Sequence, residues 1–253
     1  LHTLHLPLDT LDPFLDARVL ADERERFLTL VERRLTERVP AAYLTGEAWL
    51  QGHRFAVDSR VIVPRSPIAE LLADDLAPWI NDPDNVELVL DLCTGSGCLA
   101  VLAALAYPNA QVDAVDLSDN ALEVADENIE QFGLDGRVTT HRSDLFEQMP
   151  RCEYDLIVCN PPYVNSHSME SLPAEYRHEP TMALAGGEDG MDIVRRILRS
   201  APDFMAPDGI LVLEIGNEYE NFLAAFPDLE PVWLSTENSD DQILLLTREQ
   251  LAS

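Results

Sequence analysis

Four residues that could bind a planar amino group, Asn160-Pro161-Pro162-Tyr163, directly follow an apolar run at 154–159 that is typical of a buried strand. Proline has no amide hydrogen to give to a sheet and fixes its own φ, so the strand must end at Asn160. The Asn160 side chain then lies at the C-terminal edge of the strand, where open α/β sheets bind ligands. Its amide offers an acceptor as well as donors. The same four residues would also fit an ordinary turn, so whether they indicate a binding site depends on the motifs that precede them in the sequence.

A glycine-containing turn lies upstream, between a strand predicted at 86–92 and a helix predicted at 99–107. Gly95, Gly97 and Ala100 loosely match the dinucleotide-binding fingerprint, in which glycines let the backbone approach a ligand at a helix N-terminus. Tight turns also use glycine for geometry alone, so this match is weak by itself. Asp91, which precedes the glycines, is better suited to a ligand amine than to a pyrophosphate.

Two more carboxylates follow the next two predicted strands. Asp116 comes 25 residues after Asp91 and could accept hydrogen bonds from both hydroxyls of a ribose. Asp144 could accept one from an adenine amino group. Each aspartate alone would more often be a solvated turn residue or a helix cap. Three acids and Asn160 at the ends of four consecutive strands, however, line one edge of one sheet and predict a single binding site.

The elements that must position these residues alternate between strand and helix from residue 86 onward, which predicts a parallel sheet. Strands are expected at 86–92, 112–115, 138–141, 154–159 and 210–215, with helices at 99–107, 121–132, 192–204 and 218–226. Strands at 232–234 and 242–247 leave no room for a helix between them, so they predict an antiparallel hairpin that closes the sheet. The connection at 164–190 is longer than an ordinary loop, which indicates a functional loop.

The first part of the chain has a different pattern. Residues 1–45 are expected to be helical, with an amphipathic stretch at 21–39 that Pro40 ends. Residues 46–64 are expected to form a β-hairpin, continued by an apolar stretch at 60–63, and a helix at 68–79 leads into the main sheet. The sequence therefore divides into a helical and hairpin region at 1–66 and an α/β domain at 67–253.

The charge is strongly acidic: 46 Asp and Glu stand against 17 basic residues, giving a net charge of −29, and all 17 are Arg. Such a chain should be repelled by bare nucleic acid, and no basic run could bind phosphates. The acidity could complement a basic protein partner or form the surface of a protein from a salty cytoplasm. Because Lys is absent from the whole chain, the second explanation is favoured.

Four cysteines, Cys93, Cys98, Cys152 and Cys159, form no C-x-x-C pair. We expect free thiols in a reducing cytoplasm and no metal site. No apolar run is long enough to span a membrane and the amino end lacks a signal-peptide pattern, so a cytoplasmic location is expected. The first residue is Leu rather than Met, and we expect that part of the natural N-terminus is missing.

The order of these motifs resembles that of class I S-adenosylmethionine-dependent methyltransferases, which implies a Rossmann-like seven-stranded sheet with a C-terminal antiparallel hairpin. The Asn-Pro-Pro-Tyr motif is similar to that of enzymes that methylate planar amino groups of protein glutamine, adenine or cytosine. Three flanking patterns resemble the HemK/PrmC group of protein-(glutamine-N5) methyltransferases: Pro40-Ala41-Ala42-Tyr43-Leu44-Thr45-Gly46, Val63-Pro64-Arg65, and the run from Glu179-Pro180 to Gly186-Gly187 and Gly190.

Two main protein substrates are known in that group: the Gly-Gly-Gln loop of peptide-chain release factors and a glutamine of large-subunit ribosomal protein uL3. Release-factor enzymes usually continue Pro-Arg with Pro-Glu/Asp-Thr-Glu, whereas this chain has Ser66-Pro67-Ile68. Cys93 also stands where a glycine is more usual. The resemblance therefore implies uL3 as the partner, either free or within an assembling large subunit.

Three alternatives stay open: methylation of release factors, methylation of nucleic-acid amino groups, and a non-catalytic ribosome-assembly factor. The charge weighs against nucleic acid, and the intact set of Asp91, Asp116 and Asn160 weighs against a non-catalytic role. A nicotinamide dehydrogenase is disfavoured, because the acids are wrongly placed for a pyrophosphate.

The resemblance also implies roles for individual residues. The Asn160 side-chain oxygen and the Pro161 carbonyl would accept hydrogen bonds from the substrate NH2, Tyr163 would pack against the glutamine and the methyl donor, and no general base would be needed. The implied catalytic residues are Asn160, Pro161, Pro162 and Tyr163, and the implied cofactor residues are Asp91, Cys93, Thr94, Gly95, Ser96, Gly97, Asp116, Leu117, Asp144, Leu145 and Asn160.

The surroundings of the site follow from the same resemblance. Region 1–66 would help to recognise the protein substrate, and the loop at 164–190 would cover the site. Arg65 and Glu179 would shape its walls, although a structural ion pair explains this pair equally well.

Overall fold

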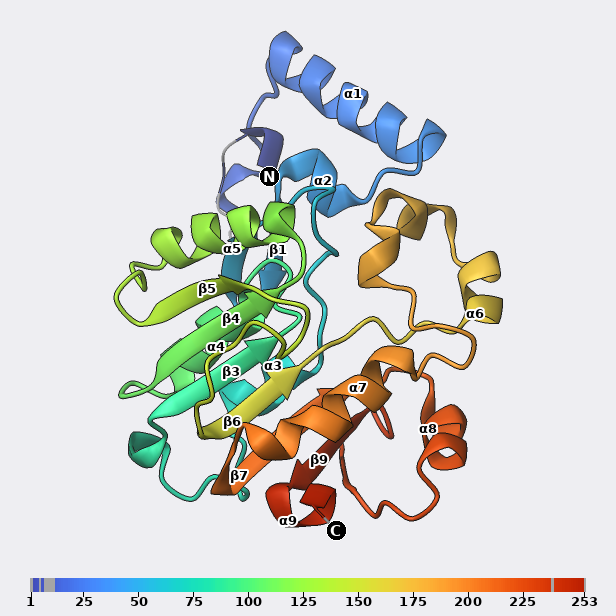
Figure 1. Cartoon of the computed structure of the whole chain (residues 1–253). Coiled ribbons are helices and arrows are strands. Elements are labelled where there is room, and N and C mark those ends of the chain that lie inside the picture. Colours follow the sequence, from blue (N-terminus) through green and yellow to red (C-terminus); the bar gives the residue numbers. More distant parts are fainter. Residues whose placement is uncertain (1, 5, 7–11, 238, 253) are drawn as a thin grey trace.

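A seven-stranded sheet forms the centre of the molecule in a computed structural model that describes residues 2–4, 6, 12–237 and 239–252 (Figure 1). Its strands lie in the order β5-β4-β3-β6-β7-β9-β8. Their bounds are β3 (Leu88–Leu92), β4 (Gln111–Asp116), β5 (Val138–Arg142), β6 (Tyr154–Cys159), β7 (Met205–Glu214), β8 (Val232–Leu234) and β9 (Ile243–Thr247). The first five strands in this order are parallel, and β9 runs antiparallel to both β7 and β8. The predicted Rossmann-like sheet with its C-terminal hairpin is therefore confirmed.

The strand order reverses between β3 and β6, which are neighbours in the sheet although four elements separate them in the chain. Ligands of open α/β sheets bind at such a switch point, outside the C-terminal ends of the strands. Leu92 of β3 lies opposite Cys159 of β6. The glycine turn that follows β3 and the Asn160 motif that follows β6 therefore begin at the same level of the sheet.

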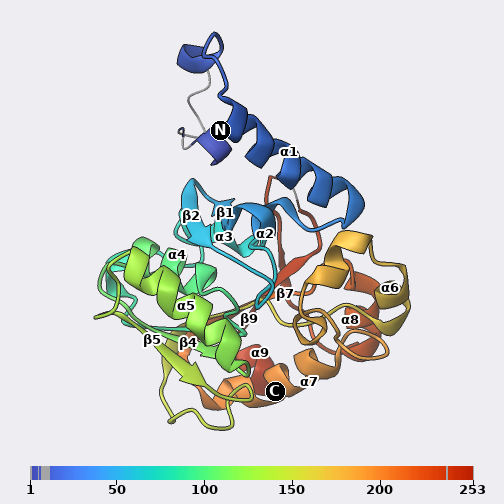
Figure 2. The ribbon, with the colours of Figure 1, turned by 90° about the horizontal axis from the view of Figure 1, so that it is seen from above.

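Helices cover both faces of the sheet, and alternate residues of each strand enter two separate cores. Leu156 and Val158 of β6 pack on the side of α3 (Ile68–Ala73), α4 (Cys98–Ala106) and α5 (Asp119–Gln131). Ile157 and Cys159 pack on the side of α7 (Asp192–Ser200), α8 (Tyr219–Ala225) and α9 (Arg248–Ala252). Figure 2 shows α4 and α5 on one side of β4 and β5 and α7 and α9 on the other. Because both faces are covered, the central strands are apolar throughout, as buried parallel strands are.

The N-terminal region consists of α1 (Ala21–Thr36), α2 (Ala41–Thr45) and a two-stranded sheet of β1 (Glu47–Leu50) and β2 (His53–Ala56). Short 3-10 turns occupy His2–Leu4 and Asp12–Phe14. The predicted hairpin is confirmed, since Gln51 and Gly52 both have the positive φ, 47° and 74°, of a tight hairpin turn. The predicted helical stretch at 1–45 includes residues 1, 5 and 7–11, which lie outside the described residues.

Three stretches differ from the predicted pattern. Residues 57–66, called the wall segment below, contain no strand, although an apolar stretch at 60–63 was expected to continue the hairpin. Helix α3 ends at Ala73 instead of near residue 79, because Asp75 and Leu76 adopt a φ of 53° that ends a right-handed helix. The long connection at 164–190 contains α6 (Ser166–Ser171) and 3-10 turns at Ala174–His178 and Thr181–Ala183. Further 3-10 turns lie at Pro83–Asn85 and Ala201–Asp203.

Helix α1 stands at the outer end of the molecule, away from the sheet (Figures 1 and 2). Its predicted apolar side is not part of a core: Phe27 is 52% exposed and Leu35 is 67% exposed. Arg34 and Arg38 connect the helix to the 164–190 connection by ion pairs to Glu175 of 2.9 and 2.6 Å. Among the described residues, no helix is long and apolar enough to cross a membrane.

We predict that Leu35→Ala lowers the free energy of unfolding by less than about 0.5 kcal/mol, because the Leu35 side chain is largely exposed. The matched change Leu72→Ala on α3 removes a side chain that is 1% exposed and should cost about 2–5 kcal/mol. Urea unfolding of both variants measures the difference. A loss of 2 kcal/mol or more for Leu35→Ala, on the scale of a core truncation, would contradict the exposed position of this side of α1.

Candidate functional site

A cavity of about 1060 Å³, the solvent at its mouth included, opens at the C-terminal ends of β3, β4, β5 and β6. Most of the residues predicted for the site line this cavity: Cys93, Thr94, Gly95, Ser96, Asp116, Leu117, Asp144, Leu145, Asn160 and Pro162. Asp91, Gly97, Pro161 and Tyr163 are not among the lining residues. Residues at or directly after the four strand ends that the sequence singled out therefore border one cavity.

Asp91 is a fully buried carboxylate at the end of β3. Its Oδ2 accepts hydrogen bonds from the Thr94 hydroxyl at 2.5 Å and the Ala100 amide at 2.9 Å. Its Oδ1 is buried and has no hydrogen-bond partner among the described residues. Burial raises the pKa of Asp91 to about 7. An orphaned buried oxygen is costly unless a donor arrives, so a ligand amine would fit this position.

The glycine turn is held closely against the neighbouring strand and helix. The Gly95 amide donates to Asp116 Oδ2 at 2.9 Å, and Oδ1 of the same carboxylate accepts from the Ser118 amide at 2.9 Å. Gly97 has a φ of 75°, and a Cβ added there would lie 3.0 Å from Ala125 Cβ on α5. Burial raises the pKa of Asp116. Each Asp116 oxygen keeps a lone pair with which it can accept a ligand hydroxyl.

Asp144 lines the cavity from the end of β5, where an ion pair already engages its carboxylate. Oδ1 lies 2.9 Å from the Arg196 guanidinium on α7, and the side chain is 36% exposed. Two apolar neighbours, the half-exposed Leu117 and the buried Leu145, line the cavity near it. The geometry allows an adenine-sized ring between apolar side chains, with a carboxylate at its edge.

The Asn160 motif presents two acceptors, the Asn160 side-chain oxygen and the Pro161 carbonyl oxygen. Among the residues that the structure describes, none donates a hydrogen bond to the Asn160 side chain or to the Pro161 carbonyl. Asn160 is half-buried and lines the cavity. The two prolines cause this arrangement, because they supply no N–H groups and prevent β6 from continuing. Asn160 at the cavity and the adjacent Pro161 carbonyl thus have acceptor capacity that could bind an incoming NH2 group.

Tyr163 is held differently from the first three residues of the motif. Its hydroxyl donates to Glu214 Oε1 at 2.7 Å, and its ring lies against Gly216, where an added Cβ would be 2.4 Å from Tyr163 Cε2. Glu214 ends β7, and the sequence analysis did not select it. The signal was present, since Glu214 follows an apolar run at 210–213 just as Asp91 follows one on β3.

The walls of the cavity come from the wall segment and from the 164–190 connection. Val61, Ile62 and Pro64 contribute on one side, and Pro180, Met182 and Ala183 contribute on the other. Arg65 and Glu179 join the two walls by hydrogen bonds of 2.6 and 2.7 Å, and the Arg65 guanidinium lies 4.9 Å from the centre of the Tyr176 ring. The two residues therefore form an ion pair between the walls, and Arg65 also lines the cavity.

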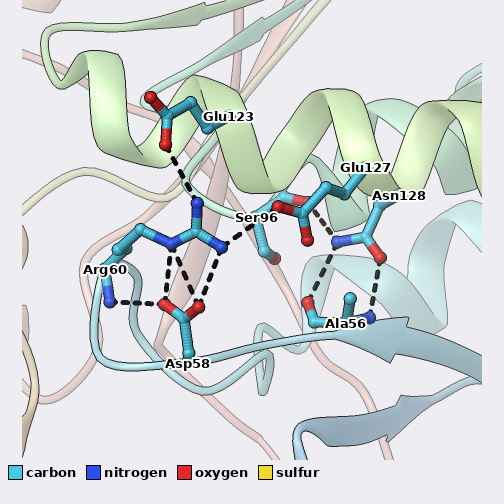
Figure 3. A network of polar contacts seen from close by, with 7 residues as sticks. All are labelled: Ala56, Asp58, Arg60, Ser96, Glu123, Glu127 and Asn128. Atoms are coloured by element: carbon cyan, nitrogen blue, oxygen red, sulfur yellow. Dashed lines mark hydrogen bonds and ion pairs between the residues drawn. The ribbon is translucent and has the colours of Figure 1, made fainter.

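Two polar side chains attach the wall segment and the glycine turn to α5 (Figure 3). Asn128 is fully buried; it accepts from the Ala56 amide at 2.7 Å and donates to the carbonyls of Ala56 at 3.1 Å and Ser96 at 2.8 Å. Arg60 binds Asp58 at 2.8 Å, Glu123 at 3.0 Å and Glu127 at 3.2 Å. Sequence reasoning missed both residues, because an Asn among acidic helix residues is typical of a solvated face and Arg60 begins a stretch that was expected to continue the hairpin.

All four cysteines are free, as predicted; Cys98 and Cys159 are buried, while Cys93 and Cys152 are half-buried. Cys93 has a φ of 62°, a backbone conformation that favours glycine. Among the described residues, no group of three or more His, Cys, Asp or Glu side chains could hold a metal ion.

The family model described as "Methyltransferase small domain" matches residues 69–175. Over 251 residues the chain is 69% identical to the ribosomal protein uL3 glutamine methyltransferase of Bordetella pertussis, covering 99% of this chain and 84% of that relative. The proteins of the same name from Burkholderia pseudomallei and from Neisseria meningitidis serogroup A are 60% and 54% identical, with 99% of this chain and 84% and 82% of those relatives covered.

Two solved structures are similar in fold. The hMettl16 catalytic domain in complex with a MAT2A 3'UTR hairpin superposes with a TM-score of 0.57 at 14% identity, covering 90% of this chain and 82% of that one. A methyltransferase from Pyrococcus furiosus gives a TM-score of 0.53 at 15% identity, covering 90% and 99% of the two chains. At this identity the likeness concerns the fold, which is that of class I methyltransferases.

We predict that Asn128→Ala lowers the free energy of unfolding by about 2–4 kcal/mol, because the backbone groups of Ala56 and Ser96 lose their partner. The control Gln131→Ala lies on the same helix and removes two exposed hydrogen bonds to Arg54, so it should cost less than about 1 kcal/mol. Urea unfolding compares the two variants. Equal losses would show that Asn128 does not hold the hairpin and the glycine turn together.

Proposed function

The chain belongs to the family of ribosomal protein uL3 glutamine methyltransferases, and we propose that it transfers a methyl group from S-adenosylmethionine to the side-chain amide nitrogen (N5) of a glutamine in large-subunit ribosomal protein uL3. One observation carries the chemical part of this proposal. Asn160 lines the cavity, and neither its side chain nor the neighbouring Pro161 carbonyl accepts a hydrogen bond from the described residues. The identity of 69% over 99% of the chain supports the choice of substrate.

The residues around the cavity fit S-adenosylmethionine. We assign Asp91 Oδ1 to the amine of the cofactor, because this oxygen is buried and lacks a donor among the described residues. Asp116 is assigned to the ribose hydroxyls, and Leu117, Asp144 and Leu145 to the adenine. The backbone of the turn at 93–97 would let the cofactor approach closely. The proposed set of cofactor residues is thus Asp91, Cys93, Thr94, Gly95, Ser96, Gly97, Asp116, Leu117, Asp144, Leu145 and Asn160.

The proposed role of Asn160 and Pro161 follows from the poor nucleophilicity of an amide nitrogen, whose lone pair is delocalised into the carbonyl. When bound, S-adenosylmethionine supplies an electrophilic methyl group on a sulfonium. Two accepted N–H hydrogen bonds fix the direction of the nitrogen lone pair and favour the positive charge that develops on nitrogen. The nitrogen then loses one proton to solvent, leaving a neutral N-methyl amide. Tyr163 would pack beside the glutamine, and Pro162 would shape the entrance.

The protein substrate requires a surface beyond the cavity. We assign substrate recognition to region 1–66, of which residues 1, 5 and 7–11 lie outside the described part, and methyl transfer to residues 67–253. The 164–190 connection would cover the site, since Pro180, Met182 and Ala183 line the cavity. A net charge of −29 supports a protein partner over nucleic acid. Since the proposed partner is a ribosomal protein, the reaction would occur in the cytoplasm, on free uL3 or on an assembling large subunit.

The proposal is tested by incubating the protein with S-adenosylmethionine labelled in the methyl group and, in separate reactions, uL3, a peptide-chain release factor or DNA. We expect label in uL3 on a glutamine side chain, located by mass spectrometry of the digested product. Label in the release factor alone would overturn the choice of uL3 as the substrate. Label in DNA alone would overturn the proposal that the chain methylates a protein.

We predict that Asn160→Ala lowers the rate of methyl transfer by at least about 10²-fold, the usual cost of removing a preorganised hydrogen-bond partner of the transition state. The dissociation constant for S-adenosylhomocysteine, measured by calorimetry, should change less than about threefold, because Asp91 and Asp116 remain. The exposed Asn109→Ala provides the control and should behave as the wild type. Wild-type turnover by Asn160→Ala would refute the assigned role.

We predict that affinity for S-adenosylhomocysteine rises about tenfold between pH 5.5 and pH 7 in the wild type. Because the pKa of Asp91 is raised, its ionised form is unfavourable in the unliganded protein. The free energy of unfolding therefore falls as the pH rises from the ordinary carboxyl pKa toward about 7. A bound ammonium offsets this cost only when Asp91 is ionised. Calorimetry across this range should therefore show a pH dependence that is absent in Asp91→Asn and retained in the exposed control Asp208→Asn. A wild-type affinity independent of pH would contradict the assignment.

A further inference from the structure

Glu214 is a carboxylate at the end of β7 with only 4% of its surface exposed, and it does not line the cavity. Each of its oxygens accepts one hydroxyl: Oε2 accepts from Ser66 at 2.5 Å, and Oε1 accepts from Tyr163 at 2.7 Å. Burial raises the pKa of Glu214, while both hydrogen bonds and the nearby Arg65 favour its ionised form. A buried carboxylate is stabilised only when such donors are present.

The position of Glu214 relates it to the methyl-transfer motif. In the parallel pairing of β6 and β7, Cys159 lies opposite Leu213, so Glu214 lies at the level of Asn160. The motif is fixed at its start by that pairing. At its other end, the Tyr163 ring lies against Gly216 and its hydroxyl binds Glu214, while the next residue, Val164, pairs with Ala185. The Tyr163 side chain, which fixes the C-terminal end of the motif, is thus held by Glu214 Oε1.

The other oxygen of Glu214 holds the wall segment. Ser66 is buried, lines the cavity and is the last residue of that segment. The residue before it, Arg65, makes the two hydrogen bonds to Glu179, whose side chain is 3% exposed. Two consecutive residues therefore attach the N-terminal region to two buried carboxylates. One of these lies in the 164–190 connection, and the other lies beside the motif.

We propose that Glu214 is a positioning residue for methyl transfer, which fixes the Asn160–Tyr163 motif through the Tyr163 hydroxyl and couples it to the wall segment through the Ser66 hydroxyl. The inference rests on the proposed function. Two acceptors that must meet one NH2 group tolerate little displacement, since an error of about 1 Å can cost about 10²-fold in rate. Displacing the wall segment moves Ser66, and Glu214 transmits this movement to Tyr163. Correct docking of a protein substrate on region 1–66 would thereby adjust the positions of the Asn160 side-chain oxygen and the Pro161 carbonyl oxygen.

The test compares Tyr163→Phe, Ser66→Ala, Glu214→Gln and the Ser66→Ala/Tyr163→Phe double variant. The control is Tyr219→Phe, because the Tyr219 hydroxyl binds no described residue and its ring contacts Trp233. We expect kcat to fall about tenfold or more in Tyr163→Phe and less in Ser66→Ala, while the dissociation constant for S-adenosylhomocysteine changes less than about twofold. The double variant should lose less than the product of the two single losses, because both hydroxyls act on one carboxylate.

Three kinetic or binding results would overturn the inference: wild-type kcat in Tyr163→Phe, strictly multiplicative losses in the double variant, or a weaker cofactor affinity with kcat unchanged. If Glu214→Gln does not fold, the Tyr163→Phe and Ser66→Ala variants still test the inference. The crystal structure of Tyr163→Phe gives a readout that needs no substrate, and the Asn160 side chain should be displaced or disordered in it; an unchanged, ordered Asn160 would overturn the inference. Methylation of release factor instead of uL3 would overturn only the proposed substrate, because the same series can then be measured on that protein.

Discussion

Two consecutive prolines after Asn160 impose the constraint on which the site depends. Because neither has an N–H group, β6 ends at Cys159, and the Asn160 side chain and the Pro161 carbonyl are left without donors from the described residues. The rest of the fold places these acceptors where they are useful. β6 is adjacent to β3 at the point where the strand order reverses, so Asn160 lines the same cavity as the glycine turn. A methyl donor and an acceptor amide can then meet in one place.

Carboxylates lie at the ends of three strands, buried at Asp91 and Glu214 and half-buried at Asp116, and their hydrogen bonds distinguish them. Asp91 on β3 keeps one oxygen free of described donors, so it can receive a ligand amine. Asp116 on β4 accepts one backbone amide on each oxygen and retains capacity for hydroxyls. Glu214 on β7 accepts two side-chain hydroxyls and so acts within the protein. The same residue chemistry therefore fits the ligand site that we propose at two strands and the support that we propose at the third.

The sequence predicted those parts of the molecule that depend on local pattern. The strand at 154–159 has the predicted bounds, since two prolines and an apolar run define both of its ends. Asp116 and Asp144 line one cavity because parallel strands share one C-terminal edge. Contacts between distant segments could not be predicted in this way. Residues 60–63 have the sequence pattern of a strand but form none in the structure. Asn128 has the sequence context of a solvated helix residue, but it binds backbone groups of the distant residues Ala56 and Ser96. The apolar side of α1 has the pattern of a packed helix, and nonetheless Phe27, Leu28 and Leu35 are exposed.

The most direct test of the account is a crystal structure of the protein with S-adenosylhomocysteine and a uL3 segment that contains the target glutamine. The account predicts that the glutamine side-chain nitrogen lies within about 2.7–3.2 Å of both the Asn160 side-chain oxygen and the Pro161 carbonyl oxygen. It also predicts that the amine of the cofactor product lies at Asp91 Oδ1. A glutamine nitrogen that donates to neither Asn160 nor Pro161 would contradict the central claim.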